Sequence, residues 1–261
     1  MSAQEPSGVT LPKRFLGVSL KMYFDHSETI MWTKDVVAAK IELEPSDLVS
    51  VVLFPSFPSI PATVELVGGT GILVGAQNIS QFDQGPFTGE VCGRTIRQTG
   101  CAYVEIGHSE RRMLFGEDDR VIQQKLSQAL SNELIPVLCI GEPQLDDAAE
   151  GGEYCINQLR AALNPILDQS SDVSIVIAYE PVYSIGADEP ASDYHIRTVC
   201  GMVKRFLAAS WPKASMRVVY GGSAGPGLFT RIAGIADGLF LGRYAHDSLA
   251  FSEILSEAMT V

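Results

Sequence analysis

Short apolar runs alternate along this chain with longer segments in which apolar residues recur every three or four positions. The runs are rich in β-branched side chains and almost continuously hydrophobic, which is typical of strands buried on both faces of a parallel sheet. The pattern predicts strands at Phe15–Leu20, Leu48–Phe54, Ile72–Ala76, Ala102–Ile106, Leu134–Cys139, Ile175–Tyr179, Met216–Tyr220 and Gly238–Leu241.

The segments between these runs have the period of amphipathic helices. One of them follows Ser27, a residue type that caps helices, and carries Ile30, Val37 and Ile41 on one face. The same period predicts helices at Thr29–Leu43, Val121–Leu130, Glu153–Leu167, Tyr194–Leu207 and Leu249–Met259. Each predicted strand is thus followed by a helix or a helical turn.

Eight strands that alternate with helices, in a chain of 261 residues, predict an α/β protein with the (β/α)8 barrel fold, the TIM barrel. No linker or low-complexity stretch divides the series, so we expect a single catalytic domain over residues 14–261 after a flexible tail over residues 1–13. A doubly wound sheet is the alternative architecture. It is less favoured because polar motifs follow the first, fourth, sixth, seventh and eighth strands, and these motifs meet only if the sheet closes.

The net charge of the chain restricts the classes of partner that it is expected to bind. Acidic residues outnumber basic ones by 31 to 19, which gives a net charge of −12. Such a surface repels nucleic acid and anionic membranes, so we expect neither as a partner. No apolar run reaches the ~18 residues that a membrane span needs, and the polar N-terminal segment does not resemble a secretion signal. The cysteines and histidines are scattered, which argues against a disulfide framework or a metal site and favours a cytoplasmic protein.

Four ionisable residues follow predicted strands. Lys21 ends the first strand, His108 and Glu110 come after the fourth, and Glu180 comes after the sixth. In a (β/α)8 barrel the carboxyl ends of the strands meet at one face, where catalytic residues gather. A carboxylate and an imidazole held there can move a proton between adjacent carbons of a small substrate. We therefore expect these four residues to form the catalytic group.

Glycine-bearing turns follow the last three strands and predict an anion site. The turns are Ser184–Gly186, Tyr220–Ser223 and Leu241–Arg243. Glycine lets backbone N–H groups approach an anion closely, and the start of a helix adds favourable partial charge. In an acidic protein, a local cation must accompany these amides. The residues expected to bind a phosphate are Lys21, Gly186, Ser223, Gly242 and Arg243.

Six short motifs resemble those of the triosephosphate isomerase family and occur in that family's order. They are Gly75–Asn78, Phe87–Glu90, Gly107–Arg112, Leu138–Glu142, Ala178–Val182 and Tyr220–Ser223. Any one of them is a weak signal, but all six in register leave little room for chance. The resemblance runs from about Phe15 to the C-terminus. It implies a (β/α)8 barrel that isomerises a small sugar phosphate without a cofactor or a metal.

The resemblance also implies a role for each catalytic residue. Glu180 is the base that takes a proton from the carbon beside the carbonyl, and neutral His108 polarises the carbonyl oxygen. Lys21 stabilises the enediolate and steers the phosphate, with Glu110 as its partner. A lid from Pro181 to about Pro190 closes over the substrate and excludes water. The lid residues singled out are Pro181, Val182, Tyr183, Ser184, Ile185 and Gly186.

Two further expectations concern the rest of the chain. In the family, the Phe87–Glu90 loop docks into a neighbouring subunit, so the resemblance implies a homodimer through this loop. Arg111 and Arg112 are expected to hold loops through carboxylates, and Cys139 is expected to pack within its strand. The histidines expected at the surface or at helix ends are His26, His195 and His246.

The chain departs from the family pattern at several positions. Ser19, a substrate contact by resemblance, stands where the family has asparagine, and Arg243 stands where it has a second glycine. These changes, with a lid that ends at Pro190, resemble a side branch that includes isomerases of four-carbon ketose phosphates such as L-erythrulose 1-phosphate, converted to D-erythrulose 4-phosphate. Interconversion of dihydroxyacetone phosphate and glyceraldehyde 3-phosphate is the first expectation, and the four-carbon reaction is the alternative. A sugar-phosphate-binding barrel without turnover is a third hypothesis.

Each residue also has a plainer interpretation when it is taken alone. In these interpretations Glu180 caps a turn, and His108 forms a hydrogen bond with a backbone carbonyl oxygen. Lys21 joins a surface ion pair, and Tyr220–Ser223 is an ordinary tight turn. All of these residues stand at once at positions that match the family motifs in order. The catalytic interpretation is therefore favoured over the plainer ones.

Overall fold

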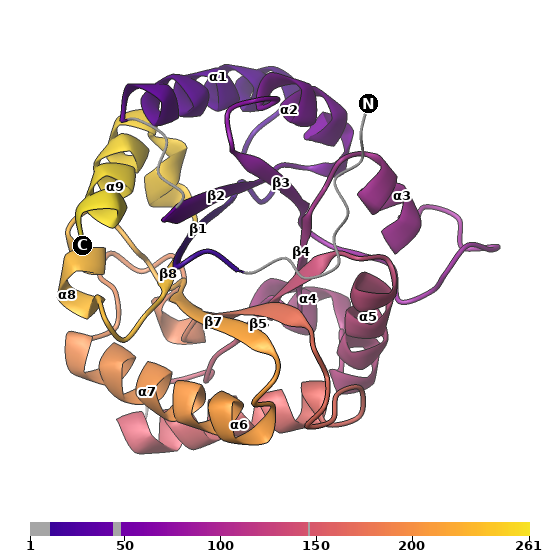
Figure 1. Cartoon of the computed structure of the whole chain (residues 1–261), viewed down its shortest axis with the longest axis vertical. Coiled ribbons are helices and arrows are strands. Elements are labelled where there is room, and N and C mark those ends of the chain that lie inside the picture. The colour runs from indigo at the N-terminus through magenta and orange to yellow at the C-terminus, as the bar shows by residue number, and fades with distance from the viewer. Residues whose placement is uncertain (1–10, 44–47, 146) are drawn as a thin grey trace.

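The computed structural model describes residues 11–43, 48–145 and 147–261, and its strands form a closed parallel barrel. Each strand pairs with its neighbour in sequence, and β8 pairs with β1 to close the ring (Figure 1). The strands are β1 Arg14–Ser19, β2 Val49–Phe54, β3 Leu73–Ala76, β4 Tyr103–Ile106, β5 Ile135–Ile140, β6 Ser174–Tyr179, β7 Ser215–Tyr220 and β8 Gly238–Leu241. The predicted (β/α)8 barrel is therefore confirmed, and the doubly wound alternative is excluded.

Helices form an outer ring around the strands (Figure 1). The α-helices are α1 His26–Glu42, α2 Ile60–Leu66, α3 Gly93–Gln98, α4 Ser109–Phe115, α5 Asp119–Ser131, α6 Ala148–Leu163, α7 Asp193–Ser210, α8 Leu228–Ile232 and α9 Ser248–Thr260. The short 3-10 turns are η1 Phe57–Ser59, η2 Val182–Ser184 and η3 Arg243–His246. Because the strands are covered on both faces, their nearly continuous apolar character fits their position.

The helices α1 and α6 begin several residues earlier than the sequence pattern predicts, because an aspartate caps each of them. Asp25, not Ser27, accepts a hydrogen bond from the amide of Glu28 at 2.8 Å. The Glu28 carboxylate accepts in turn from the amide of Asp25, which completes a capping box and starts α1 directly after Asp25. Asp147 caps α6 in a similar way through its side chain, so that helix also starts earlier than expected.

Aromatic side chains fill the interior of the barrel. Phe15, Phe54, Tyr103 and Phe240 lie there with at most 3% of their surface exposed. Gly17 of β1 leaves the space that these rings need, since a Cβ atom at this position would meet the Phe240 ring at 2.5 Å. The interior is therefore a packed core below the carboxyl ends of the strands.

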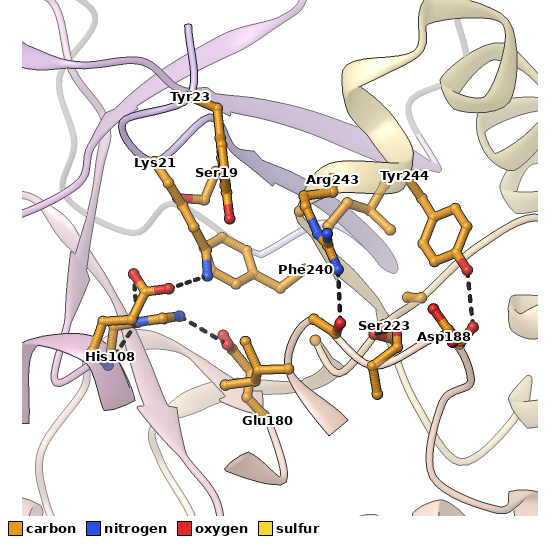
Figure 2. Close-up of a pocket in the computed structure, with 18 residues that line it drawn as sticks. Ser19, Lys21, Tyr23, His108, Glu180, Asp188, Ser223, Phe240, Arg243 and Tyr244 are labelled. Atoms are coloured by element: carbon orange, nitrogen blue, oxygen red, sulfur yellow. Dashed lines mark hydrogen bonds and ion pairs between the residues drawn. The ribbon is translucent and has the colours of Figure 1, made fainter. Parts of the chain in front are cut away.

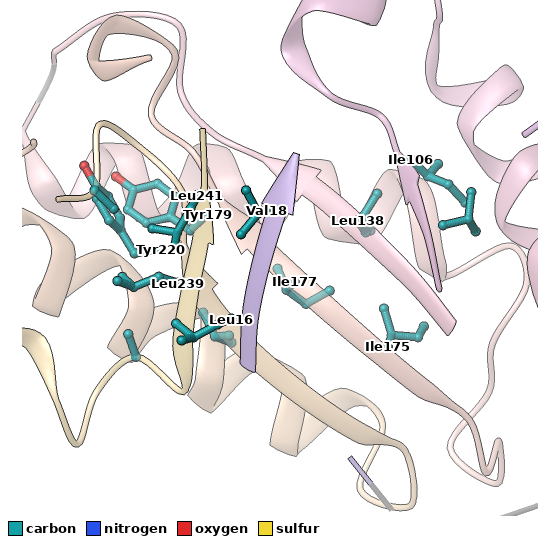
Figure 3. Packing of buried hydrophobic residues seen from close by; sticks show 14 of the residues in the cluster. Leu16, Val18, Ile106, Leu138, Ile175, Ile177, Tyr179, Tyr220, Leu239 and Leu241 are labelled. Carbon is teal, nitrogen blue, oxygen red and sulfur yellow. The ribbon is translucent and has the colours of Figure 1, made fainter. Parts of the chain in front are cut away.

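A second apolar layer lies between the barrel and the helices. Val18, Leu138, Ile177 and Leu239 point outward from four different strands into this layer (Figure 3). Successive residues of a strand face opposite sides, so each strand contributes to both layers. Packing on both faces holds the strand ends in defined positions, which is what a precise site requires.

Most of the predicted N-terminal tail, residues 1–10, lies outside the described residues. Leu11 is 2% exposed and belongs to the interior cluster of the barrel. The guanidinium of Arg217 donates hydrogen bonds to the carbonyl oxygens of Leu11 and Pro12. Within the described part of the chain, none of the helices has the length and apolar character to cross a membrane.

Candidate active site

The carboxyl ends of the strands surround a cavity of about 620 Å³. Its wall comes from segments that follow β1, β4, β6, β7 and β8 and that lie far apart in sequence (Figure 2). The predicted site residues found in this wall are Ser19, Lys21, His108, Glu110, Glu180, Ile185, Gly186, Ser223, Gly242 and Arg243. Closure of the sheet thus brings the predicted catalytic and phosphate-binding residues into one pocket.

Glu180 and His108 form the buried centre of the pocket. The Nε2 atom of His108 lies 3.2 Å from Oε2 of Glu180, and the two residues are 3% and 5% exposed, respectively (Figure 2). The other carboxylate oxygen of Glu180, Oε1, is buried without a hydrogen-bond partner among the described residues. The carboxylate therefore keeps an unused acceptor beside the imidazole.

The backbone after β4 sets the orientation of the His108 ring. His108 caps α4, and its Nδ1 accepts a hydrogen bond from the amide of Glu110 at 3.1 Å. Burial lowers the pKa of His108, whereas the carboxylates of Glu180 and Glu105 raise it, and the net pKa is about 9. The amide acts in the opposite direction, because an N–H group can bond only the unprotonated nitrogen. In the neutral ring this bond places the proton on Nε2, directed at Glu180.

Lys21 is held at the mouth of the pocket by its backbone and by one carboxylate. Its φ of 50° lies in the left-handed region, which a lysine adopts only when its surroundings impose it. The amide of Gln77 donates to the Lys21 carbonyl oxygen at 2.9 Å, and the Nζ atom lies 2.6 Å from Oε1 of Glu110. Burial lowers the pKa of Lys21, whereas Glu110 and Glu180 raise it above its usual value. The side chain is therefore a fixed cation.

Three backbone amides on the opposite side of the pocket are free to bind an anion. Gly186, Ser223 and Gly242 line the cavity, and among the described residues their amides donate to no other protein group. Gly186 and Ser223 have positive φ angles of 75° and 40°. Backbone N–H groups that turn toward a cavity in this way make an anion-binding concavity.

The lid is tied to the loops after β7 and β8. The Ser223 hydroxyl lies 2.7 Å from the carbonyl oxygens of Ser184 and Ala187, and Arg243 donates to the carbonyl oxygen of Gly186 at 2.7 Å (Figure 2). Tyr244 donates to the backbone of the lid in the same region. Of the predicted lid residues, Ile185 and Gly186 line the cavity. The remaining four, Pro181, Val182, Tyr183 and Ser184, form the turn that leads into it.

Two arginines and one histidine lie where the sequence predicts, but the histidine is buried. Arg111 pairs with Glu117, and Arg112 pairs with Asp119, so both hold the loops around α4. His195 lies at a helix end, in the first turn of α7, but it is not at the surface. It is 4% exposed, and its Nε2 lies 2.8 Å from the buried carboxylate of Glu142. The reason is that α7 starts at Asp193 and turns the face of its first turn toward the end of β5.

Glu105 is a site residue that the sequence pattern did not single out. It lies in β4, is 4% exposed, and accepts a hydrogen bond from the Ser19 hydroxyl at 3.0 Å. The sequence does contain a signal for this residue: Glu105 is a carboxylate at an inward-facing position of a strand that is otherwise apolar and buried. Phe240 and Tyr244 also line the pocket without having been predicted.

Known proteins resemble this chain in sequence and in fold. Residues 14–258 match the family model of triosephosphate isomerase. The chain is 43% identical over 251 residues to a Pectobacterium atrosepticum protein named L-erythrulose-1-phosphate isomerase, covering 95% of this chain and 97% of that protein. It is 35% identical over 228 residues to the triosephosphate isomerase of Moorella thermoacetica, covering 85% of this chain and 91% of that protein.

A crystal structure of triosephosphate isomerase from Bartonella henselae has the same fold, with a TM-score of 0.81 over 95% of this chain and 100% of that chain at 23% identity. The chain therefore belongs to the triosephosphate isomerase family. This membership confirms the prediction of a sugar-phosphate isomerase as a class. The relatives carry two different substrate names, so the substrate is a separate question from the class.

Proposed function

We propose that this protein moves a proton between adjacent carbons of a short sugar phosphate through an enediolate. The observation that carries the proposal is the contact of 3.2 Å between Nε2 of His108 and Oε2 of Glu180 in a pocket that also holds Lys21. A base, an electrophile and a fixed cation are the groups that this chemistry needs. All three are present, which disfavours a binding barrel without turnover.

In the proposed mechanism, the Glu180 carboxylate takes the proton from the carbon beside the substrate carbonyl. His108 donates the hydrogen bond from Nε2 to the carbonyl oxygen, so that the electron pair of the broken C–H bond moves onto that oxygen. The protonated Glu180 then returns its proton to the former carbonyl carbon. The hydroxyl proton on the carbon that lost its hydrogen passes through His108 to the other oxygen, and the new carbonyl forms on that first carbon. No hydride leaves the substrate, and atoms and charge balance without a cofactor.

Lys21 and Glu110 support the same intermediate. The ammonium of Lys21 stabilises the negative charge of the enediolate and attracts the phosphate. Glu110 holds that ammonium through the contact of 2.6 Å and also donates its amide to His108. One residue therefore orients both the cation and the imidazole.

The phosphate is assigned to the amides of Gly186, Ser223 and Gly242, with the guanidinium of Arg243 beside them. The lid closes the pocket through its contacts with Ser223 and Arg243. Closure excludes water, which otherwise promotes loss of phosphate from the enediolate.

Two substrates fit this proposal. The triose phosphate pair, dihydroxyacetone phosphate and glyceraldehyde 3-phosphate, is the first candidate, because many relatives carry the name triosephosphate isomerase. Conversion of L-erythrulose 1-phosphate to D-erythrulose 4-phosphate is the second. It is supported by the relative with 43% identity and by Ser19, whose short side chain leaves room for another carbon.

We also propose a homodimer in the cytoplasm. The segment between β3 and α3, which contains Phe87–Glu90, projects away from the barrel (Figure 1). Its Phe82 and Phe87 rings stack with centroids 4.1 Å apart. Leu114 and Phe115 at the end of α4 are 74% and 66% exposed. Apolar side chains left in water on a projecting loop and a helix end are suited to a subunit interface.

The reaction is tested by turnover in D2O followed by 1H NMR, with each of the two substrates. Transfer by a base that exchanges with solvent puts deuterium on the carbon that receives the proton. Isomerisation without deuterium in the product shows that Glu180 returns the same proton, whereas deuterium at a carbon outside the two adjacent ones contradicts the proposed transfer. Absence of turnover with both substrates overturns the proposed function.

A further inference from the structure

A buried carboxylate lies directly beneath the substrate pocket and is hydrogen-bonded to a residue of the pocket wall. Glu105 of β4 shares the interior face with Tyr103, because strand residues alternate between faces. Its carboxylate accepts from the Ser19 hydroxyl at 3.0 Å. In the barrel order, β2 and β3 separate β1 from β4, so this bond crosses the interior. A buried carboxylate in an apolar core is costly unless it has such a partner.

Ser19 connects Glu105 to the cavity. Ser19 lines the pocket, whereas Glu105 lies behind it and is 4% exposed. The backbone of Ser19 is held from the other side, since Nε2 of His246 lies 3.3 Å from its carbonyl oxygen. In Figure 2, Ser19 lies beside Lys21, away from Ser223 and the proposed phosphate site. Ser19 therefore faces the part of a substrate that is remote from the phosphate.

The bond to Glu105 decides which groups Ser19 can bind. A serine hydroxyl has one proton to donate and two lone pairs to accept with. The proton is used on Glu105, so Ser19 offers only acceptors to the cavity. An acceptor backed by a carboxylate disfavours a carbonyl oxygen or a developing oxyanion and favours a hydroxyl that donates. An asparagine at this position has an N–H donor and no such restriction.

We propose that Ser19 and Glu105 form a recognition site for a substrate hydroxyl that takes no part in the proton transfer. This inference rests on the proposed function and selects among its substrates. L-erythrulose 1-phosphate carries a hydroxymethyl group beyond the two reacting carbons, at the end remote from its phosphate. Dihydroxyacetone phosphate has no such group. The Ser19–Glu105 pair therefore selects the four-carbon ketose phosphate.

The protonation state of Glu105 determines the pH at which substrate preference is measured. Burial and the Glu180 carboxylate raise the pKa of Glu105, whereas His108, the Ser19 hydroxyl and Lys21 lower it, and the net pKa is about 7. Above this pKa the carboxylate only accepts hydrogen bonds, so Ser19 donates its proton to Glu105 and presents only acceptors to the cavity. A protonated Glu105 donates to Ser19 instead and releases the Ser19 proton toward the cavity. The preference for the four-carbon substrate is therefore expected to be greatest at about pH 8.5 and to decrease below pH about 7.

The test compares kcat/KM for L-erythrulose 1-phosphate and dihydroxyacetone phosphate in the Ser19→Ala and Glu105→Met variants at about pH 8.5. Each variant is expected to raise KM for the four-carbon substrate about tenfold. The loss of kcat/KM for the triose substrate should be smaller than the loss for the four-carbon substrate. Because the two residues act as one unit, the double variant should lose no more selectivity than either single variant. Glu105→Gln, whose amide oxygen still accepts from Ser19, should keep most of the preference.

Equal losses for both substrates, or unchanged selectivity in both variants, overturn the inference. Ser19→Ala removes one oxygen atom and is the variant least able to disturb folding, and thermal unfolding by circular dichroism checks both proteins. A wild-type protein that turns over the triose but not the four-carbon substrate also overturns the inference and leaves the proposed function intact. A wild-type protein inactive on both substrates overturns the proposed function itself.

Discussion

A Cβ atom on Gly221 would lie 2.5 Å from Cγ of Glu180, closer than such atoms approach in proteins. Gly221 is therefore required by the position of the proposed base. The Tyr220–Ser223 motif was interpreted from the sequence as a source of amides for phosphate. The structure adds a second reason for its glycines, because a Cβ on Gly222 would similarly meet the Ser184 hydroxyl at 2.0 Å.

Replacement of Gly221 by alanine should displace the Glu180 carboxylate. We expect Gly221→Ala to lower kcat by about tenfold to a hundredfold, because a shift of about 1 Å in a catalytic group has effects of this size. Steady-state kinetics measures the loss. The matched control is Gly225→Ala, where the added Cβ meets Tyr244 at an ordinary 3.5 Å. Equal effects of the two substitutions would show that Gly221 does not position the base.

Arg243 should act through the lid. Its guanidinium donates to the Gly186 carbonyl oxygen, so Arg243→Ala is expected to weaken closure. The KM should rise several-fold, and more inorganic phosphate should be released per turnover as water reaches the enediolate. Phosphate release is measured alongside product formation. Arg231→Ala, which removes an exposed pair with Asp193 remote from the pocket, is the control and should change neither quantity.

The buried carboxyl of Glu105 should make stability depend on pH. Its pKa of about 7 in the folded protein lies above its ordinary value of 4.5, so folding favours the protonated form. The resulting destabilisation is absent below about pH 4.5, grows as pH rises, and is complete above about pH 7. Glu105→Gln should therefore be more stable than the wild type at about pH 8.5, by about 2–3 kcal/mol, with little difference at about pH 5.

Urea unfolding at the two pH values measures this difference. The exposed Glu65→Gln serves as the control, because no burial penalty acts on a carboxylate in water. If Glu105→Gln and the wild type differ equally at both pH values, the Glu105 carboxyl does not titrate as described.

The proposed dimer depends on the projecting loop. Phe87→Asp places a charge within the stacked pair of rings and should give a monomer in sedimentation-velocity experiments. Leu249→Asp on α9 is the matched control, since Leu249 is 75% exposed but lies outside this surface, and it should stay dimeric. A wild-type monomer at micromolar concentration would contradict the proposal.

The sequence predicts the barrel well because every strand is covered on both faces and therefore reads as an apolar run. It also predicts Lys21, His108 and Glu180 as partners, since each stands at the polar end of such a run. What it predicts poorly depends on contacts between distant segments. Glu105 lies inside an apolar run, and its meaning becomes visible only when the closed barrel places it against Ser19.

Local capping chemistry explains most of the remaining differences. The sequence pattern predicts a start of α1 after Ser27, although Asp25 and Glu28 form the capping box that begins the helix. The sequence predicts His195 at the surface or at a helix end but does not predict its burial, because the contact with Glu142 requires both the start of α7 and the end of β5. Neither contact leaves a periodic signal in the chain.

Glu180 as the base is the step on which the proposed reaction depends most directly. The decisive measurement is kcat of Glu180→Gln with both substrates, beside Glu189→Gln, which changes an exposed lid carboxylate outside the cavity wall. We expect kcat of Glu180→Gln to fall by about a thousandfold on whichever substrate the wild type converts, and Glu189→Gln to stay near wild type. A Glu180→Gln variant with wild-type kcat would contradict the account.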